Sequence, residues 1–205
     1  MKSQKFSSAN RNRSRHRLRE ILLESIRTKQ ALLSDAILQS ILSASESITH
    51  SFRRGGKLIL YGNGGSASDS LHIAGEFLGR FSHDIQRPSL PAVALSGNPA
   101  SLTAISNDFG YLYSFARELE GFASPHDIAF GISTSGNSPN VLEATKVAKK
   151  KRLYTIGLTG GTGGKLKRLV DVCILVPSTN TQRIQESHIT IGHAICELVE
   201  KALYG

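Results

Sequence analysis

The sequence predicts an α/β fold: a doubly wound, five-stranded parallel sheet flanked by helices, with N-terminal helices ahead of the first strand. Two observations lead to this prediction. Short segments that are apolar throughout and rich in β-branched residues recur along the chain, and stretches with helical periodicity separate them. Strands that are apolar on both faces are typical of parallel sheets covered by helices on each side.

Two helices are expected before the first strand. Between Leu18 and Phe52 the apolar residues recur at intervals of three and four, and the pair Gly55-Gly56 ends the pattern. The residues ahead of this pattern, 1–15, are predicted to form a basic disordered tail, and residues 16–205 a single domain. A chain of 205 residues is long enough for one domain with a full core.

The elements of the sheet domain follow in alternation. The expected strands are residues 57–61, 92–95, 128–132, 154–158 and 172–176. The expected helices are residues 66–80, 99–120 with a break near 108–110, 139–150, a short one at 165–169, and a last one at about 182–203.

The positive charge of the chain is concentrated at its start. Residues 1–19 hold seven of the 25 lysines and arginines and no acidic residue, so the rest of the chain is close to neutral although the formal net charge is +9. We interpret the tail as a solvated extension, so nucleic acid is not expected as a partner except through this segment. An Arg- and Ser-rich start also resembles an organelle transit peptide, and this alternative stays open.

Other compositional features exclude two classes of protein. No apolar run approaches the roughly 18 residues that cross a bilayer, so no membrane association is expected, and no secretory signal is seen. The two cysteines, Cys173 and Cys196, are too few for a disulfide framework. We therefore expect a cytoplasmic protein.

Three loops at the carboxyl ends of strands are candidate ligand sites, because open α/β sheets bind ligands there. The turn Asn63-Gly64-Gly65-Ser66 opens a helix and gives a weak phosphate signal. The hydroxyl-rich loop from Ser133 to Pro139 gives a stronger one, although helix capping alone could explain Ser138 and Pro139. The segment from Thr159 to Gly164 is interpreted as a flexible turn.

Acid–base side chains lie on two of the expected helices. His72 and Glu76 are four residues apart and share a helix face, and Gln185, His188 and His193 fall on one broad face of the last helix. A carboxylate and an imidazole suit ketose–aldose isomerisation. His72, Glu76, Gln185 and His193 also suit a divalent metal such as zinc.

Five stretches together carry a resemblance to a known family: GNGGSASDSLHIAGEF, ISNDFG, GISTSGNS, LTGGTGG and RIQESHITIGHAICELVE. In order and spacing they resemble the phosphoheptose isomerases, whose fold is the sugar isomerase (SIS) domain. The resemblance implies conversion of sedoheptulose 7-phosphate to D-glycero-D-manno-heptose 7-phosphate. It also implies a homotetramer with active sites at subunit interfaces.

The resemblance further implies roles for individual residues. It makes Glu76 the catalytic base and His193 its acid–base partner, and it makes His72, Glu76, Gln185 and His193 the ligands of one zinc ion per subunit. Substrate contacts are implied for Asn63, Gly64, Gly65, Ser66, Glu76, Asn107, Asp108, Ser133, Thr134, Ser135, Ser138 and Gln185. The sequence departs from the family at two positions: Gly75 stands where many relatives have an acidic residue, and Gln182 stands where some have an aspartate.

A second reading is a non-catalytic SIS module that binds a phosphosugar or a partner resembling a replication initiator. The known module of the latter kind lacks the glutamate and the final histidine of the isomerases. Both Glu76 and His193 are present here, which favours the enzyme.

Overall fold

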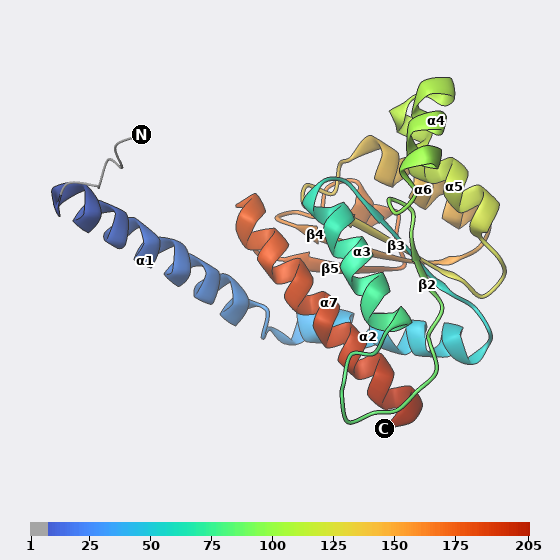
Figure 1. Ribbon diagram of the computed structural model, residues 1–205, viewed down its shortest axis with the longest axis horizontal. Helices are drawn as coiled ribbons and strands as arrows, with labels where there is room; N and C mark the ends of the chain where they lie inside the picture. The colour runs from blue at the N-terminus through green and yellow to red at the C-terminus, as the bar shows by residue number, and fades with distance from the viewer. Residues whose placement is uncertain (1–7) are drawn as a thin grey trace, which may run out of the picture.

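The computed structural model describes residues 8–205 and shows one five-stranded sheet in the order β2-β1-β3-β4-β5, parallel throughout (Figure 1). The strands are β1 (Leu58–Gly62), β2 (Ala92–Ala94), β3 (Ile128–Ser133), β4 (Tyr154–Gly160) and β5 (Val172–Val176). β1 and β3 lie at the centre in register, with Leu58 opposite Ile128. The predicted fold class is confirmed.

The helices also follow the predicted order. They are α1 (Ser8–Ala31), α2 (Asp35–Arg53), α3 (Gly65–Leu78), α4 (Pro99–Phe109), α5 (Ser114–Phe122), α6 (Pro139–Lys150) and α7 (Thr181–Tyr204), with short 3₁₀ turns at Tyr111–Tyr113 and Leu166–Arg168. The break expected near residues 108–110 separates α4 from α5, because Gly110 there adopts a φ of +87°.

Side chains of alternate strand residues pack into two hydrophobic cores, one on each face of the sheet. Leu58 and Leu60 of β1 pack with α2, α3 and α7, whereas Ile59 and Tyr61 pack with α5 and α6. This is the period of two that a strand imposes on its side chains, and both faces are apolar because both are covered. The sheet is therefore a rigid layer from which the loops at its carboxyl ends extend.

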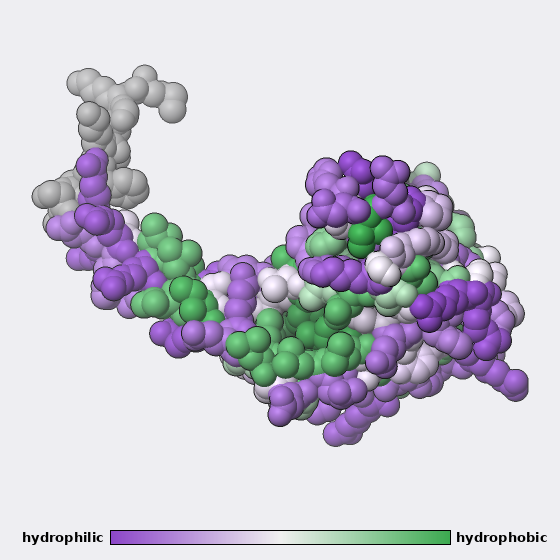
Figure 2. All heavy atoms as spheres, turned by 90° about the horizontal axis from the view of Figure 1, so that it is seen from below, coloured by the Kyte–Doolittle hydropathy of each residue, from purple (hydrophilic) through white to green (hydrophobic). Residues whose placement is uncertain are grey.

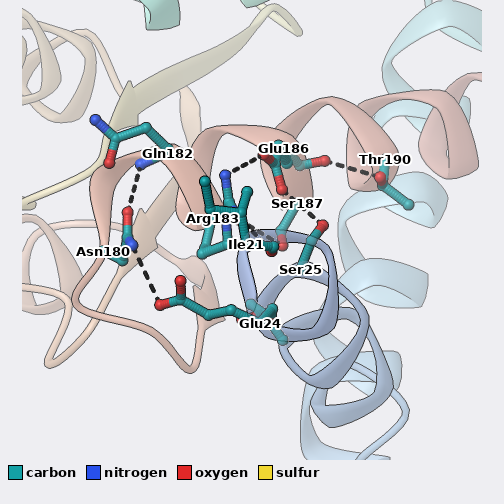
Figure 3. Close-up of polar contacts among 10 residues, drawn as sticks. Ile21, Glu24, Ser25, Asn180, Gln182, Arg183, Glu186, Ser187 and Thr190 are labelled. Atoms are coloured by element: carbon teal, nitrogen blue, oxygen red, sulfur yellow. Dashed lines mark hydrogen bonds and ion pairs between the residues drawn. The ribbon is translucent and has the colours of Figure 1, made fainter. Parts of the chain in front are cut away.

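The first helix does not lie on the sheet. α1 projects from the body of the molecule, and its C-terminal half meets the start of α7 (Figure 1). There Arg183 donates to the Ile21 carbonyl at 2.7 Å, and Ser25 donates to Glu186 at 2.7 Å (Figure 3). Asn180, the N-cap of α7, donates to Glu24 at 3.1 Å. These contacts fix α1 to the helix that carries His193.

The predicted disordered tail is wrong for residues 8–15, since α1 begins at Ser8 and runs through residue 15 without interruption. Seven residues of the predicted tail, 1–7, lie outside the described residues. The described residues include no helix long and apolar enough to cross a membrane.

Large apolar side chains are exposed along α1 and the start of α2 (Figure 2). They are Leu18, Leu22, Leu23, Ile26, Leu33, Leu38 and Leu42, and we call this set the α1 apolar surface. Leu22 alone is 56% exposed. An apolar surface that runs along a projecting helix is typical of a protein–protein contact.

Candidate active site

The loops after β1, β3 and β4 meet at the carboxyl edge of the sheet, as the topology requires. Asn63 after β1 exchanges hydrogen bonds with Asn140 at the start of α6, at 2.8 and 2.9 Å. The Tyr111 hydroxyl donates to the Asn63 side chain at 2.7 Å. Asn63 thus connects the first turn, the loop after β3 and the segment between α4 and α5.

The hydroxyl-rich loop of residues 133–138 does not use its serines to cap the helix. Ser138 occupies the N-cap position of α6 with Pro139 after it, as expected, but its side chain makes no capping hydrogen bond. The Ser138 hydroxyl instead lies 2.9 Å from that of Ser133. Helix capping therefore does not explain these hydroxyls, which remain available to a ligand at the N-terminus of α6.

Thr159 and Gly160 end β4, and a turn follows them, as the sequence indicates; hydrogen bonds on either side connect this turn to the hydroxyl-rich loop. Gly160 donates its backbone N–H to the Thr134 carbonyl at 3.0 Å, and Leu166 donates to the Gly136 carbonyl at 2.9 Å. The Lys165 N–H donates to the Asn137 side chain at 3.1 Å, and that side chain donates to the Ser135 carbonyl at 3.0 Å. Gly160, Lys165 and Leu166 therefore hold the hydroxyl-rich loop in place.

Close packing between α3 and α7 brings two histidines and a glutamate together. The Nε2 atom of His72 lies 3.0 Å from a Glu76 oxygen and 2.9 Å from Nε2 of His193. One ligand atom from each of the three side chains falls within 4.8 Å of the others. His72 is exposed and the other two are half-buried, so a ligand can reach all three.

Glycines on the facing helices permit this approach. A Cβ on Gly192 would lie 2.6 Å from Cδ1 of Ile73, and a Cβ on Gly65 would lie 2.3 Å from Nε2 of Gln185. Real side-chain carbons do not approach so closely, so a larger residue would displace the side chain of Ile73 or of Gln185. Gln185 consequently lies over the start of α3, at the Gly64-Gly65 turn.

Comparisons with known proteins agree with this geometry. The sequence profile of the SIS domain matches residues 22–160. Phosphoheptose isomerase of Aneurinibacillus thermoaerophilus is 50% identical over 88% of this chain and 90% of that protein. Phosphoheptose isomerase 2 of Campylobacter jejuni is 47% identical over 89% and 90%. The chain belongs to the phosphoheptose isomerase family.

Solved structures lead to the same family. The phosphoheptose isomerase from Neisseria gonorrhoeae superposes with a TM-score of 0.85 at 37% identity, over 91% of this chain and 98% of that one. The phosphoheptose isomerase from Francisella tularensis gives a TM-score of 0.87 at 32% identity, over 92% and 98%. The family resemblance inferred from the motifs is confirmed.

Not every residue singled out from the sequence joins the site. His188, placed on a face with Gln185 and His193, is wholly buried, and burial lowers its pKa to about 4. It is a neutral core histidine. Ser66 is also buried, beneath the turn at the start of α3. Asn107 and Asp108 are exposed at the end of α4, where Asn107 donates to Asp108 at 2.9 Å.

Asp69 is a residue that sequence reasoning missed. It lies in α3 one turn before His72, half-buried, and its Oδ2 atom has no hydrogen-bond partner among the described residues. Burial raises the pKa of Asp69 to about 6, and the nearby His72 opposes this rise. The only signal in the sequence is an acidic residue in the first turns of a helix, which N-terminal helix electrostatics alone could explain.

The raised pKa makes a prediction about stability. Below the ordinary pKa of 3.8 the Asp69 carboxyl is neutral in the folded and the unfolded chain alike. As the pH rises from 3.8 through about 6, the free energy of unfolding falls, because the folded state then holds a poorly solvated carboxylate. Asp69→Asn should therefore raise the free energy of unfolding at pH 7.5 by about 1–2 kcal/mol, after allowance for partial solvent screening.

Urea unfolding at pH 7.5 and pH 4 tests this prediction. The difference between Asp69→Asn and the unsubstituted protein should shrink at pH 4. Asp108→Asn, which changes an exposed carboxyl on α4, is the matched control and should leave stability unchanged at both pH values. An equal effect of Asp69→Asn at the two pH values would contradict the assignment.

Proposed function

We propose that the protein is an aldose–ketose isomerase that converts sedoheptulose 7-phosphate to D-glycero-D-manno-heptose 7-phosphate. The observation that carries the proposal is the contiguous group Glu76, His72 and His193 on α3 and α7, since α7 also lines the hollow beside Thr134 and Ser135. A carboxylate and an imidazole at this separation can move protons between neighbouring atoms of a sugar. The curated relatives named phosphoheptose isomerase support the choice of substrate.

The substrate phosphate is assigned to the loop of Ser133, Thr134, Ser135 and Ser138. The Ser133 and Ser138 hydroxyls lie 2.9 Å apart at the start of α6. A hollow of about 260 Å³ opens beside Thr134 and Ser135. Hydroxyl and backbone donors at a helix N-terminus suit a phosphate monoester.

Gly164 tests the support of this loop. Its φ is +54°, and a Cβ there would lie 2.5 Å from the Ser135 carbonyl and 2.7 Å from Nδ2 of Asn137. Gly164→Ala should therefore displace the phosphate loop and raise the KM for sedoheptulose 7-phosphate by about tenfold or more, since a misplaced donor loses hydrogen bonds to a charged group. Steady-state kinetics measure this effect.

Gly55→Ala is the matched control. Gly55 follows α2, outside this loop, and has a φ of +77°, and a Cβ there would meet no heavy atom within 4 Å. It should share the backbone strain without displacing the loop, so its KM should stay near that of the unsubstituted enzyme. Equal KM values for the two variants would remove the supporting role from this segment.

We assign the proton transfers to Glu76 and His193, the two residues that the family resemblance implies. Glu76 takes the proton from C1 of the ketose while His193 supplies a proton to the oxygen on C2, which gives an enediol. Glu76 then returns a proton to C2, and His193 accepts the proton from the oxygen on C1, so the product is the aldose and both residues are restored. Support comes from the position of His72, which lies between them within hydrogen-bonding distance of each.

Glu76→Gln should lower kcat by about 10²–10⁴-fold, because glutamine keeps the shape and loses the basicity of the carboxylate. The measurement is turnover of sedoheptulose 7-phosphate, with circular dichroism to verify folding. Glu197→Gln removes an exposed carboxylate of α7 that pairs with Lys201 at 2.7 Å and should leave kcat unchanged. Near-normal turnover of a folded Glu76→Gln protein would show that Glu76 is not the catalytic base.

The same side chains fit a zinc ion. Zinc binds nitrogen and oxygen ligands at roughly 2.0–2.2 Å, so its ligand atoms lie about 3–4 Å apart, and the three donors here lie within 4.8 Å of one another. His72, Glu76 and His193 would hold the ion, with Gln185 as the fourth ligand that the family resemblance implies. When bound, zinc would supply Lewis-acid polarisation of the sugar oxygens.

Removal of the metal should lower activity, and added zinc should restore it. His193→Ala should lose both bound zinc and turnover while the protein stays folded. Elemental analysis of protein purified without chelator, paired with kinetics before and after metal removal, decides this. Full activity in verified metal-free protein would leave His193 as an acid–base residue alone.

We further propose that the α1 apolar surface joins copies of this chain into the homotetramer that the resemblance implies. The surface runs along a helix that projects from the body, so a neighbouring subunit can cover it (Figures 1 and 2). Hydrogen bonds join α1 to α7, the helix that carries Gln185 and His193. Assembly through α1 would therefore place subunit contacts beside the active site.

Leu22→Glu should dissociate the oligomer, because a carboxylate on a buried apolar contact cannot be solvated. Light scattering after size-exclusion chromatography measures the molar mass of each variant and so shows whether the oligomer has dissociated. Arg27→Glu changes an exposed polar position on the same helix and should leave the mass unchanged. A monomeric unsubstituted protein, or an unchanged mass for Leu22→Glu, would rule out this interface.

A further inference from the structure

A second cavity lies at the opposite edge of the sheet from the active site. It has a volume of about 450 Å³, and its walls include Ile128 and Tyr154, the first residues of β3 and β4. The hydroxyl-rich loop lies at the other ends of these strands. A volume of this size suits a small-molecule ligand, and the proposed isomerisation makes no use of it.

Basic side chains dominate the mouth of this cavity. His50 and Arg54 come from the end of α2, and His126 and Arg152 come from the turns that precede β3 and β4. Nη2 of Arg54 lies 3.4 Å from Nε2 of His126, so the side chains from two separate segments converge.

Two acidic residues also line the cavity, and they do not cancel this charge. Asp127 is buried, and its carboxylate is neutralised by an ion pair with Lys57 at 2.6 Å. Glu46 is exposed and is the other carboxylate of the lining. Arg54 and Arg152 therefore leave the mouth positive even when its two histidines are neutral.

The backbone gives an independent reason to regard this cavity as a binding site. Among the described residues, positive φ angles occur at seven glycines and at two other residues, His126 with φ +77° and Arg152 with φ +62°. Both of these line this one cavity. A left-handed conformation is unfavourable for residues with a Cβ, and such strain is concentrated at functional sites.

Glycine would satisfy the local structure at both positions. Asp127 donates its N–H to the Ser124 carbonyl at 3.2 Å, which closes a turn with Pro125 second and His126 third, the position where positive φ favours glycine. Arg152 follows the C-cap of α6 and donates to the Lys149 carbonyl at 2.9 Å, which is the usual place of a glycine after a helix. The chain instead places a basic side chain at each.

We propose that the cavity lined by Arg54, His126 and Arg152 is a second ligand site, which binds the phosphate group of a small phosphorylated molecule. The two guanidinium groups and the imidazoles bind the phosphate oxygens, since arginine forks match that geometry. The exposed ring of Tyr154 forms a wall for the rest of the ligand. The site is separate from the isomerase site and does not depend on the proposed reaction.

The experiment uses the full chain with Ser135→Asp, in which the carboxylate repels phosphate from the active-site loop. Calorimetric titration with inorganic phosphate should still show binding in this protein. Adding Arg152→Gly or His126→Gly should weaken that binding by about tenfold or more, because each removes a donor to a charged group. Adding Lys151→Ala, which removes a neighbouring exposed charge outside the cavity lining, should have little effect.

Thermal unfolding distinguishes a ligand site from a structural role. Glycine relieves the left-handed strain at both positions, so the midpoint of unfolding should be unchanged or higher in Arg152→Gly and His126→Gly. A clear fall in that midpoint would show that the side chains hold the fold, and would overturn the proposal. Absence of phosphate binding in the Ser135→Asp protein, or equal losses in the glycine and Lys151→Ala variants, would overturn it as well.

Discussion

The close contact of α3 with α7 is the constraint on which the candidate active site depends. Gly192 lets α7 approach the side chain of Ile73, and the residues adjacent to this pair in sequence, His193 and His72, then meet. Arg87 reinforces the contact from the far end: it pairs with Glu200 of α7 at 2.6 Å and donates to the carbonyls of Glu76 and Phe77. Because Arg87 and Glu200 are both buried, this pair is well shielded from water and fixes the end of the helix that carries Glu76.

The hydroxyl-rich loop depends on backbone contacts more than on side chains. Gly160 at the end of β4 and two residues after it donate three backbone N–H groups to residues 134–137, and the Asn137 side chain connects the two segments. Asn63 and Asn140 connect the first turn to the same region. Donors held in this way need not reorganise when an anion binds, which is the physical basis of a preorganised anion site.

The two edges of the sheet carry basic or polar groups for different reasons. At the carboxyl edge, helix N-termini and hydroxyls provide donors that need no strained side chain. At the amino edge, left-handed positions at His126 and Arg152 carry basic side chains despite the conformational cost. The contrast is the reason for assigning the second cavity a ligand rather than a packing role.

The sequence by itself determined the fold class, because runs that are apolar on both faces can only be buried between helix layers. It also identified His72 and Glu76 as neighbours, since four residues make one helical turn. Helical spacing alone could not separate His193 from His188, because it cannot say which face meets which neighbour. The family resemblance pointed to His193, and the tertiary structure shows His193 beside His72 and His188 buried in the core. The tertiary structure likewise revealed Asp69, whose burial raises its pKa, and the glycine segment after β4, whose partners are more than 20 residues away in the chain. The helix through residues 8–15 escaped the sequence prediction because arginine and serine patterns are compatible with both helix and solvated coil.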